Sequence, residues 1–222
     1  MIAAVSGMLA GAVHVWSGPD HLAAIAPLAI DRQQRPWLVG IRWGVGHSAG
    51  VAIVGILALL LREVLPIDTL SGWGERLVGV MLVGIGLWGV RKAMRTRVHA
   101  HRHEHDGVEH THVHVHTDPA NHEAPGAHAH THAALGVGIL HGLAGSSHFL
   151  GVLPALAFPT MAQAVTYVAA FAAGTIVSMA VFAGMMGWVA TRRARNGARH
   201  YRRLMVACSV AAIVVGGFWL VR

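Results

Sequence analysis

Charged residues are scarce in this chain of 222 residues, where they make up 12% of the sequence. A soluble domain carries about 25%, because its surface needs a polar layer around the core. Hydrophobic residues account for 54% of the chain. The composition therefore excludes a water-soluble globular protein and predicts a membrane protein.

Cysteine and lysine are almost absent, since the chain has one of each, Cys208 and Lys92. A single thiol excludes a disulfide framework, a Cys-pair redox site and a zinc cluster of several thiolates. Histidine, in contrast, occurs 18 times. Any metal chemistry of this chain must therefore rest on imidazole rather than on thiolate.

Six apolar runs are long enough to cross a membrane, which takes about 20 helical residues for roughly 30 Å of hydrocarbon. They cover residues 2–30, 37–61, 70–90, 133–157, 160–190 and 204–221. Gly18-Pro19 interrupts the first run, because proline removes a backbone donor and clashes with the preceding turn. Such a break at membrane depth is tolerated only inside the protein or beside a cavity.

The basic residues are distributed unevenly between the connections, and this predicts the topology. Of the 17 Arg and Lys residues, 14 fall in the first, third and fifth connections and three on the opposite side, Arg62, Arg76 and Arg222. The positive-inside rule then places segment 96–132 in the cytoplasm and both termini outside a multi-pass protein of the inner membrane. The same asymmetry accounts for the net charge of +7, so no nucleic-acid partner is expected.

Two segments of the chain repeat each other. HVWSGPDHLAAIAPLAI from His14 and HGLAGSSHFLGVLPALA from His141 align without gaps, with identities at His14/His141, Gly18/Gly145, His21/His148 and Pro27/Pro154. Because each half has three spans, the second half must lie inverted relative to the first. We therefore expect an all-α polytopic membrane protein of six transmembrane helices in two inverted three-helix repeats, residues 1–95 and 133–222, with the first and fourth helices interrupted.

Five histidines and one aspartate lie inside the predicted spans. They are the candidate metal ligands His14, Asp20, His21, His47, His141 and His148. A carboxylate at the centre of a span costs about 2.5–3.5 kcal/mol, so Asp20 needs a histidine, a helix N-terminus or a cation as its partner. Imidazole with carboxylate suits Ni²⁺, Co²⁺, Zn²⁺ or Cu²⁺. The alternative is that each histidine bonds a backbone carbonyl freed by a helix break, and it is strongest for His47.

The segment between the halves is rich in histidine. Residues 99–132 hold 12 of the 18 histidines, with few apolar residues and two prolines. Its composition predicts a disordered loop over 96–132 that binds metal loosely as a local reservoir. Metal affinity should fall as the pH drops through the free imidazole pKa of about 6.5. Its role as buffer, sensor or gate stays open.

These motifs resemble those of the nickel/cobalt transporter superfamily. HVWSGPDH in the first span, GHSAG in the second and ILHGLAGSSH in the fourth are most similar to its six-span NicO, RcnA and UreH-like branch. The resemblance implies transition-metal transport, with His14, Asp20 and His21 matching the signature motif and His47 matching the histidine of the second span.

Taken together, we expect transport of a divalent transition-metal ion, nickel or cobalt first and zinc as a further candidate, across the inner membrane. No enzyme activity and no resident cofactor are expected, and the partners are the metal ion and the lipid bilayer. Three alternatives stay open: an accessory protein for metal delivery to urease or hydrogenase that does not itself transport, a membrane metalloenzyme, and a transporter of small organic or anionic substrates. Direction, metal, energy source and oligomeric state stay open too.

Overall fold

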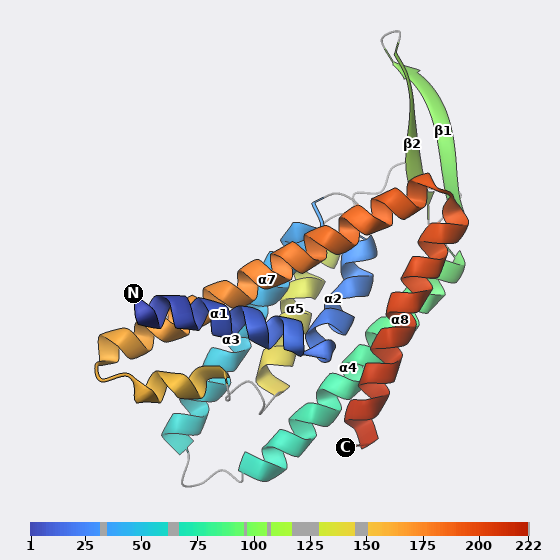
Figure 1. Cartoon of the computed structure of the whole chain (residues 1–222). Helices are drawn as coiled ribbons and strands as arrows, with labels where there is room; N and C mark the ends of the chain where they lie inside the picture. Colours follow the sequence, from blue (N-terminus) through green and yellow to red (C-terminus); the bar gives the residue numbers. More distant parts are fainter. Residues whose placement is uncertain are drawn as a thin grey trace.

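The computed structural model describes residues 1–31, 35–61, 67–95, 97–105, 108–116, 129–144 and 151–221. These residues form a helical bundle from which one two-stranded hairpin projects (Figure 1). The elements are α1 (Ile2–Ser17), α2 (Pro19–Asp31), α3 (Trp37–Leu61), α4 (Ile67–Arg95), β1 (Arg97–His105), β2 (Val108–His116), α5 (Ala129–Ala144), the 3-10 helix η1 (Leu153–Ala157), α7 (Met161–Arg195) and α8 (Ala198–Val221).

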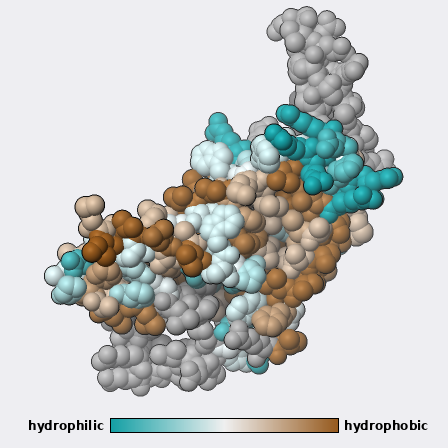
Figure 2. Space-filling view, in the orientation of Figure 1, coloured by the Kyte–Doolittle hydropathy of each residue, from teal (hydrophilic) through white to brown (hydrophobic). Residues whose placement is uncertain are grey.

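Within the described residues, four helices are long and apolar enough to cross a membrane. They are Trp37–Leu57, Gly72–Arg95, Met161–Arg195 and Ala198–Val221, whereas Ile2–Ser17 and Ala133–Ala144 are apolar but shorter. Their outward side chains are apolar, as with Leu87, Val214 and Phe218, each more than half exposed. Figure 2 shows this apolar surface along the bundle. The chain is therefore a multi-pass helical membrane protein.

The expected break in the first apolar run is present. Gly18 ends α1 in an extended conformation (φ −91°, ψ 98°), and Pro19 occupies the first position of α2. Proline suits this position, because its missing N–H would have no helical partner there. The fourth run, 133–157, is not one α-helix either: α5 ends at Ala144, and η1 covers Leu153–Ala157.

The central segment, for which the sequence predicts a disordered loop, contains two stretches that the structure describes as strands. Residues 97–105 and 108–116 form β1 and β2, paired antiparallel from Arg97–His116 to His105–Val108. The sequence agrees with strands here, because histidine alternates with valine, alanine, threonine, arginine or glutamate. This alternation has the period of two that a strand requires.

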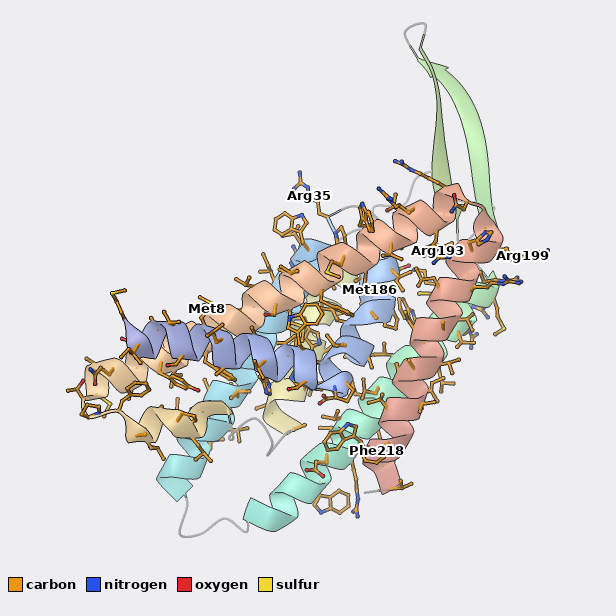
Figure 3. All side chains as sticks on the ribbon, viewed as in Figure 1. Met8, Arg35, Met186, Arg193, Arg199 and Phe218 are labelled. Atoms are coloured by element: carbon orange, nitrogen blue, oxygen red, sulfur yellow. The ribbon has the colours of Figure 1, made fainter. Side chains whose placement is uncertain are left out.

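The basic residues gather at the end of the bundle from which the hairpin projects. Arg35, Arg193 and Arg199 lie there, opposite Phe218 (Figure 3), and the surface at this end is hydrophilic (Figure 2). The fifth connection, which the predicted spans 160–190 and 204–221 place at residues 191–203, is much shorter in the structure, because α7 continues to Arg195 and α8 begins at Ala198. Only Asn196 and Gly197 separate them, and Gly197 has a φ of 109°, a conformation that glycine adopts without steric cost.

Glycine allows the helices to pack at backbone distance. In α3, a Cβ at Gly40 would collide with Met179 of α7, and a Cβ at Gly50 would meet the carbonyl oxygen of Ile139 in α5. The four glycines Gly40, Gly44, Gly46 and Gly50 of α3 all make such contacts with α7 or α5, which is the close packing that small residues allow between membrane helices. The pairs α1–α7, α3–α5 and α4–α8 run side by side in this way, and α2, which is mostly buried, lies among them (Figure 1).

Candidate metal centre

Four histidines and one aspartate from four helices meet inside the bundle. They are His14 of α1, Asp20 and His21 of α2, His47 of α3 and His141 of α5. His21, His47 and His141 are at most 2% exposed, and Asp20 is 7% exposed. The structure thus brings together all the predicted ligands except His148, which lies outside the described residues.

Asp20 joins two histidines through its two carboxylate oxygens. Its Oδ1 lies 3.0 Å from Nδ1 of His21, and its Oδ2 lies 3.1 Å from Nε2 of His141. Asp20 also stands in the first turn of α2, where the helix dipole favours a negative charge. These contacts supply the partners that a buried carboxylate requires, and they connect α2 of the first half to α5 of the second.

The imidazoles form two overlapping groups. The ligand atoms of His14, His21 and His47 lie within 4.8 Å of one another, and so do those of Asp20, His21 and His141. Two nitrogens bound to one ion at 2.0–2.1 Å lie at most about 4.2 Å apart. Small side-chain rotations therefore suffice to bring either group onto an ion.

The helix break and two glycine contacts place these side chains. Because the chain turns at Gly18, His14 at the end of α1 lies against His21 of α2, with ring centroids 4.6 Å apart. A Cβ on Gly142 of α5 would collide with the carbonyl oxygen of His47. The close approach of α3 and α5 sets His47 and His141 beside each other, with ring centroids 5.6 Å apart.

Trp43 belongs to this centre, although the sequence analysis missed it. Its ring is fully buried and stacks on His47, with centroids 5.0 Å apart and planes 13° apart. It also lies 5.1 Å from the ring of His141. The available signal was its spacing, because a residue four positions before His47 lies on the same helix face.

The centre offers a metal ion the imidazole nitrogens of four histidines and one carboxylate, nearly all of them buried. Asp20 engages Nδ1 of His21, so coordination of an ion by His21 uses Nε2. A carboxylate that fixes a ligating imidazole in this way is the usual outer support of a metal site. Nitrogen donors of this kind suit late divalent ions such as Ni²⁺, Co²⁺ and Zn²⁺.

The comparisons with known proteins identify a transmembrane family and two relatives from a plant. The family described as "Cytochrome C biogenesis protein transmembrane region" matches residues 3–219. The chain is 35% identical over 220 residues to "Chloroplast protein FOR GROWTH AND FERTILITY 1" of Arabidopsis thaliana, covering 97% of this chain and 58% of that protein. It is 33% identical over 217 residues to "Chloroplast protein FOR GROWTH AND FERTILITY 2" of the same plant, covering 97% and 55%. The chain therefore spans little more than half the length of these two relatives.

A bacterial relative is more distant. The "Urease accessory protein UreH" of Bacillus sp. (strain TB-90) is 27% identical over 198 residues, which covers 86% of this chain and 78% of that protein. No solved structure gives a significant match.

Proposed function

Because the chain belongs to the family of the cytochrome C biogenesis protein transmembrane region, we propose a membrane-transport role for its buried centre, with a divalent transition-metal ion as cargo. Nickel and cobalt are the first candidates, and zinc is a further one. The observation that carries this proposal is the convergence of His14, His21 and His47 beside Asp20 within a helical membrane bundle. The proposal assigns the chain no enzymatic reaction and no resident cofactor.

Each residue of the centre has a distinct role in this proposal. His14, His21 and His47 hold the ion, while Asp20 orients His21 and offsets part of the ion's charge. His141 is held by Oδ2 of Asp20 and couples the centre to α5. If ion binding displaced the carboxylate of Asp20, His141 would lose this partner and α5 would be released. His148 stays a proposed ligand from the repeat with His21.

We also propose that the six apolar runs form two inverted repeats around this centre. Reciprocal contacts support it: a Cβ on Gly11 would meet Phe171 and Thr175, and a Cβ on Gly138 would meet Trp43 and His47. Each residue in the second contact corresponds to one in the first at an offset of 127 or 128 positions. A site between such repeats suits alternating access, in which one repeat rocks against the other.

The proposed membrane is the inner cell membrane, with segment 96–132 in the cytoplasm and both termini outside. The clustering of Arg35, Arg193 and Arg199 at one end of the bundle supports this orientation (Figure 3). The two plant relatives are named as chloroplast proteins, so an organellar membrane is the alternative.

The proposal does not extend to thiol chemistry, despite the description of the family. A dithiol–disulfide couple within one chain needs two thiols, and this sequence has Cys208 alone. A second candidate function is metal delivery without transport, as an accessory protein. The similarity to a urease accessory protein favours it.

Metal flux into proteoliposomes tests the proposal. Purified protein should carry Ni²⁺ or Co²⁺ inward above the level of empty liposomes. Asp20→Asn and His21→Gln should lower the flux about tenfold or more, because loss of a ligand or its outer support weakens a metal site by that order. His200→Gln is the matched control, since His200 is exposed on α8 away from the centre, and its flux should equal that of the wild type.

Two outcomes would contradict the proposal. If the wild-type protein gave no flux above that of empty liposomes, the transport proposal would be wrong. Ni²⁺ binding that still depended on Asp20 would then favour the accessory role. Equal flux in Asp20→Asn, His21→Gln and the wild type would remove the centre from the pathway and favour another substrate.

A further inference from the structure

Thr175 of α7 is a buried threonine whose hydroxyl the fold does not use. Its side chain is fully buried, and its Oγ1 has no hydrogen-bond partner among the residues that the structure describes. A buried hydroxyl without a partner costs free energy, because it has given up its hydrogen bonds to water. Such a group therefore needs an explanation, and a role in ligand binding is one.

Another threonine of the same helix shows how such a hydroxyl is normally satisfied. Oγ1 of Thr166 donates a hydrogen bond to the carbonyl oxygen of Ala162, at 2.7 Å. This bond to the carbonyl four residues earlier is the usual one for a helical threonine. The equivalent carbonyl for Thr175 is that of Phe171, which lies against Gly11 of α1. Thr175 makes no such bond, so its hydroxyl is left for a partner outside its own helix.

Thr175 borders the metal centre on the side of α1. A Cβ on Gly11 would meet the backbone nitrogen of Thr175, and Gly11 lies about one helical turn before His14. Phe171 lies one turn before Thr175 on the same face of α7, and its ring centroid is 5.5 Å from that of His14. The α1–α7 contact thus sets Thr175 next to the part of the centre that His14 forms.

Two sets of contacts at this level match each other. In each set, a glycine meets an aromatic residue and a polar residue four positions after it, and the aromatic ring lies 5.1 Å or 5.5 Å from a histidine ring. The residues, in that order, are Gly138, Trp43, His47 and His141 in one set and Gly11, Phe171, Thr175 and His14 in the other. Thr175 therefore takes the position that His47 has in the centre.

A threonine hydroxyl suits a different task from an imidazole. Imidazole binds a late divalent ion directly, whereas a hydroxyl donates and accepts hydrogen bonds and so can hold a water that is bound to the ion. His14, His21 and His47 offer three nitrogens, which leaves coordination positions for water. Zn²⁺ is complete as a tetrahedron, whereas Ni²⁺ with nitrogen and oxygen ligands is often tetragonal and accepts further water. An additional held water therefore stabilises Ni²⁺ more than Zn²⁺.

We propose that Thr175 is a further binding residue of the centre, whose hydroxyl holds a water ligand of the ion and thereby favours Ni²⁺ over Zn²⁺. This inference rests on the proposed function, since it names how the same centre selects its cargo. It gives Thr175 no direct bond to the metal.

Variants of the full-length protein in detergent micelles test the role of this hydroxyl. Thr175→Val replaces the hydroxyl by a methyl group, and Thr175→Ser keeps it. Thr166→Val is the matched control, because Thr166 is exposed on the same helix and its hydroxyl is bonded within that helix. Asp20→Asn identifies the share of metal binding that belongs to the centre, so that binding by segment 96–132 can be subtracted.

Equilibrium dialysis with Ni²⁺ and with Zn²⁺ measures the two affinities of the centre. Thr175→Val should weaken Ni²⁺ binding about tenfold, the order found when a metal site loses an outer support, and should weaken Zn²⁺ binding much less. Thr175→Ser and Thr166→Val should keep the wild-type preference. Without metal, Thr175→Val should unfold at the wild-type temperature or above, because it removes a buried hydroxyl that has no partner. A purely structural role predicts a lower unfolding temperature instead.

Unchanged Ni²⁺ affinity in Thr175→Val, or equal losses in Thr175→Val and Thr175→Ser, would overturn the inference. Equal losses of Ni²⁺ and Zn²⁺ affinity would overturn it too, because the hydroxyl would then select no ion. If Asp20→Asn removed no metal binding, the centre and this inference would both be wrong. Binding that depends on Thr175 without flux into proteoliposomes would overturn the transport proposal only. Flux that depends on Asp20 but not on Thr175 would overturn this inference only.

Discussion

Asp20 contacts two histidines of the centre, on two helices, through its own carboxylate oxygens. Its oxygens lie 3.0 Å and 3.1 Å from His21 and His141, so its protonation or removal affects two helices at once. Its position follows from Pro19, which begins α2 and puts the carboxylate in the first turn. Trp43 acts differently, since it offers a ring face to His47 and no metal ligand.

We predict that Trp43 positions His47 by stacking. Trp43→Ala should abolish most Ni²⁺ flux, because the emptied space lets His47 and His141 move and costs about 3–5 kcal/mol of stability. Trp43→Phe should restore flux to within a few-fold of wild type, because it keeps an aromatic face. Flux into proteoliposomes is the measurement, and Trp37→Ala is the control, because Trp37 is 45% exposed on the same helix.

The Trp43→Phe variant tests whether the aromatic ring at residue 43 positions His47 by stacking. If Trp43→Phe and Trp43→Ala transported equally poorly, the stacking interpretation would be wrong. Equal, undiminished flux in both variants would show that Trp43 has no part in the centre.

At the scale of elements, pairs of helices in backbone contact determine where the ligands lie. The α3–α5 pair is the clearest, because Gly46 and Gly50 of α3 face α5, while Gly138 and Gly142 of α5 face α3. Membrane helices pack closely where residues are small, since lipid gives no hydrophobic drive for their association. This contact is what holds His47 and His141 near each other.

Gly142→Ala should separate α3 from α5, because the new Cβ would collide with the carbonyl oxygen of His47. We expect a loss of about 1–3 kcal/mol in stability, as for an overpacked interior, together with lower Ni²⁺ flux. Gly136→Ala is the matched control on α5, because nothing lies within 4 Å of its Cβ position. Thermal unfolding in detergent micelles measures the first effect.

Gly136→Ala should unfold at the wild-type temperature or slightly above, because alanine favours helix over glycine. Identical unfolding temperatures for Gly142→Ala and Gly136→Ala would contradict the role given to the α3–α5 contact.

At the scale of the whole molecule, charge is concentrated at one end of an apolar bundle. The hairpin and the labelled Arg35, Arg193 and Arg199 lie at that end (Figure 3). Arg95 ends α4 two residues before Arg97 begins β1, while Trp73 lies near the other end of the same helix. Basic segments stay on the cytoplasmic side during insertion, so this end defines the proposed orientation.

Labelling of single cysteines should report that orientation. In a Cys208→Ser background, Arg199→Cys should react with a membrane-impermeant maleimide only when the cytoplasmic face is accessible. Trp73→Cys should react in intact cells from outside, since Trp73 is 66% exposed near the start of α4. The reverse labelling pattern would show that the proposed orientation is wrong. Reaction of both cysteines from the same side would contradict the prediction that α4 spans the membrane.

Several features of the fold could be predicted from the sequence because they depend on local chemistry. The Gly18-Pro19 pair ends one helix and begins the next because of the backbone properties of glycine and proline, which do not depend on tertiary contacts. The apolar runs at 37–61, 70–90, 160–190 and 204–221 correspond to α3, α4, α7 and α8. The ends of elements were less predictable. Arg199, Arg202 and Arg203 were expected in a loop but lie in α8, because arginine is compatible with helix as well as with solvent.

The sequence by itself determined the membrane class of this protein and the break before α2, since these follow from composition and from the backbone properties of glycine and proline, and it predicted the burial of Asp20, His21, His47 and His141. Only the tertiary structure decided that Asp20 contacts both His21 and His141, that Trp43 stacks on His47, and that residues 97–105 pair antiparallel with residues 108–116. These arrangements depend on helix packing and strand register, in which residues far apart in the chain are brought together by contacts that no local pattern encodes.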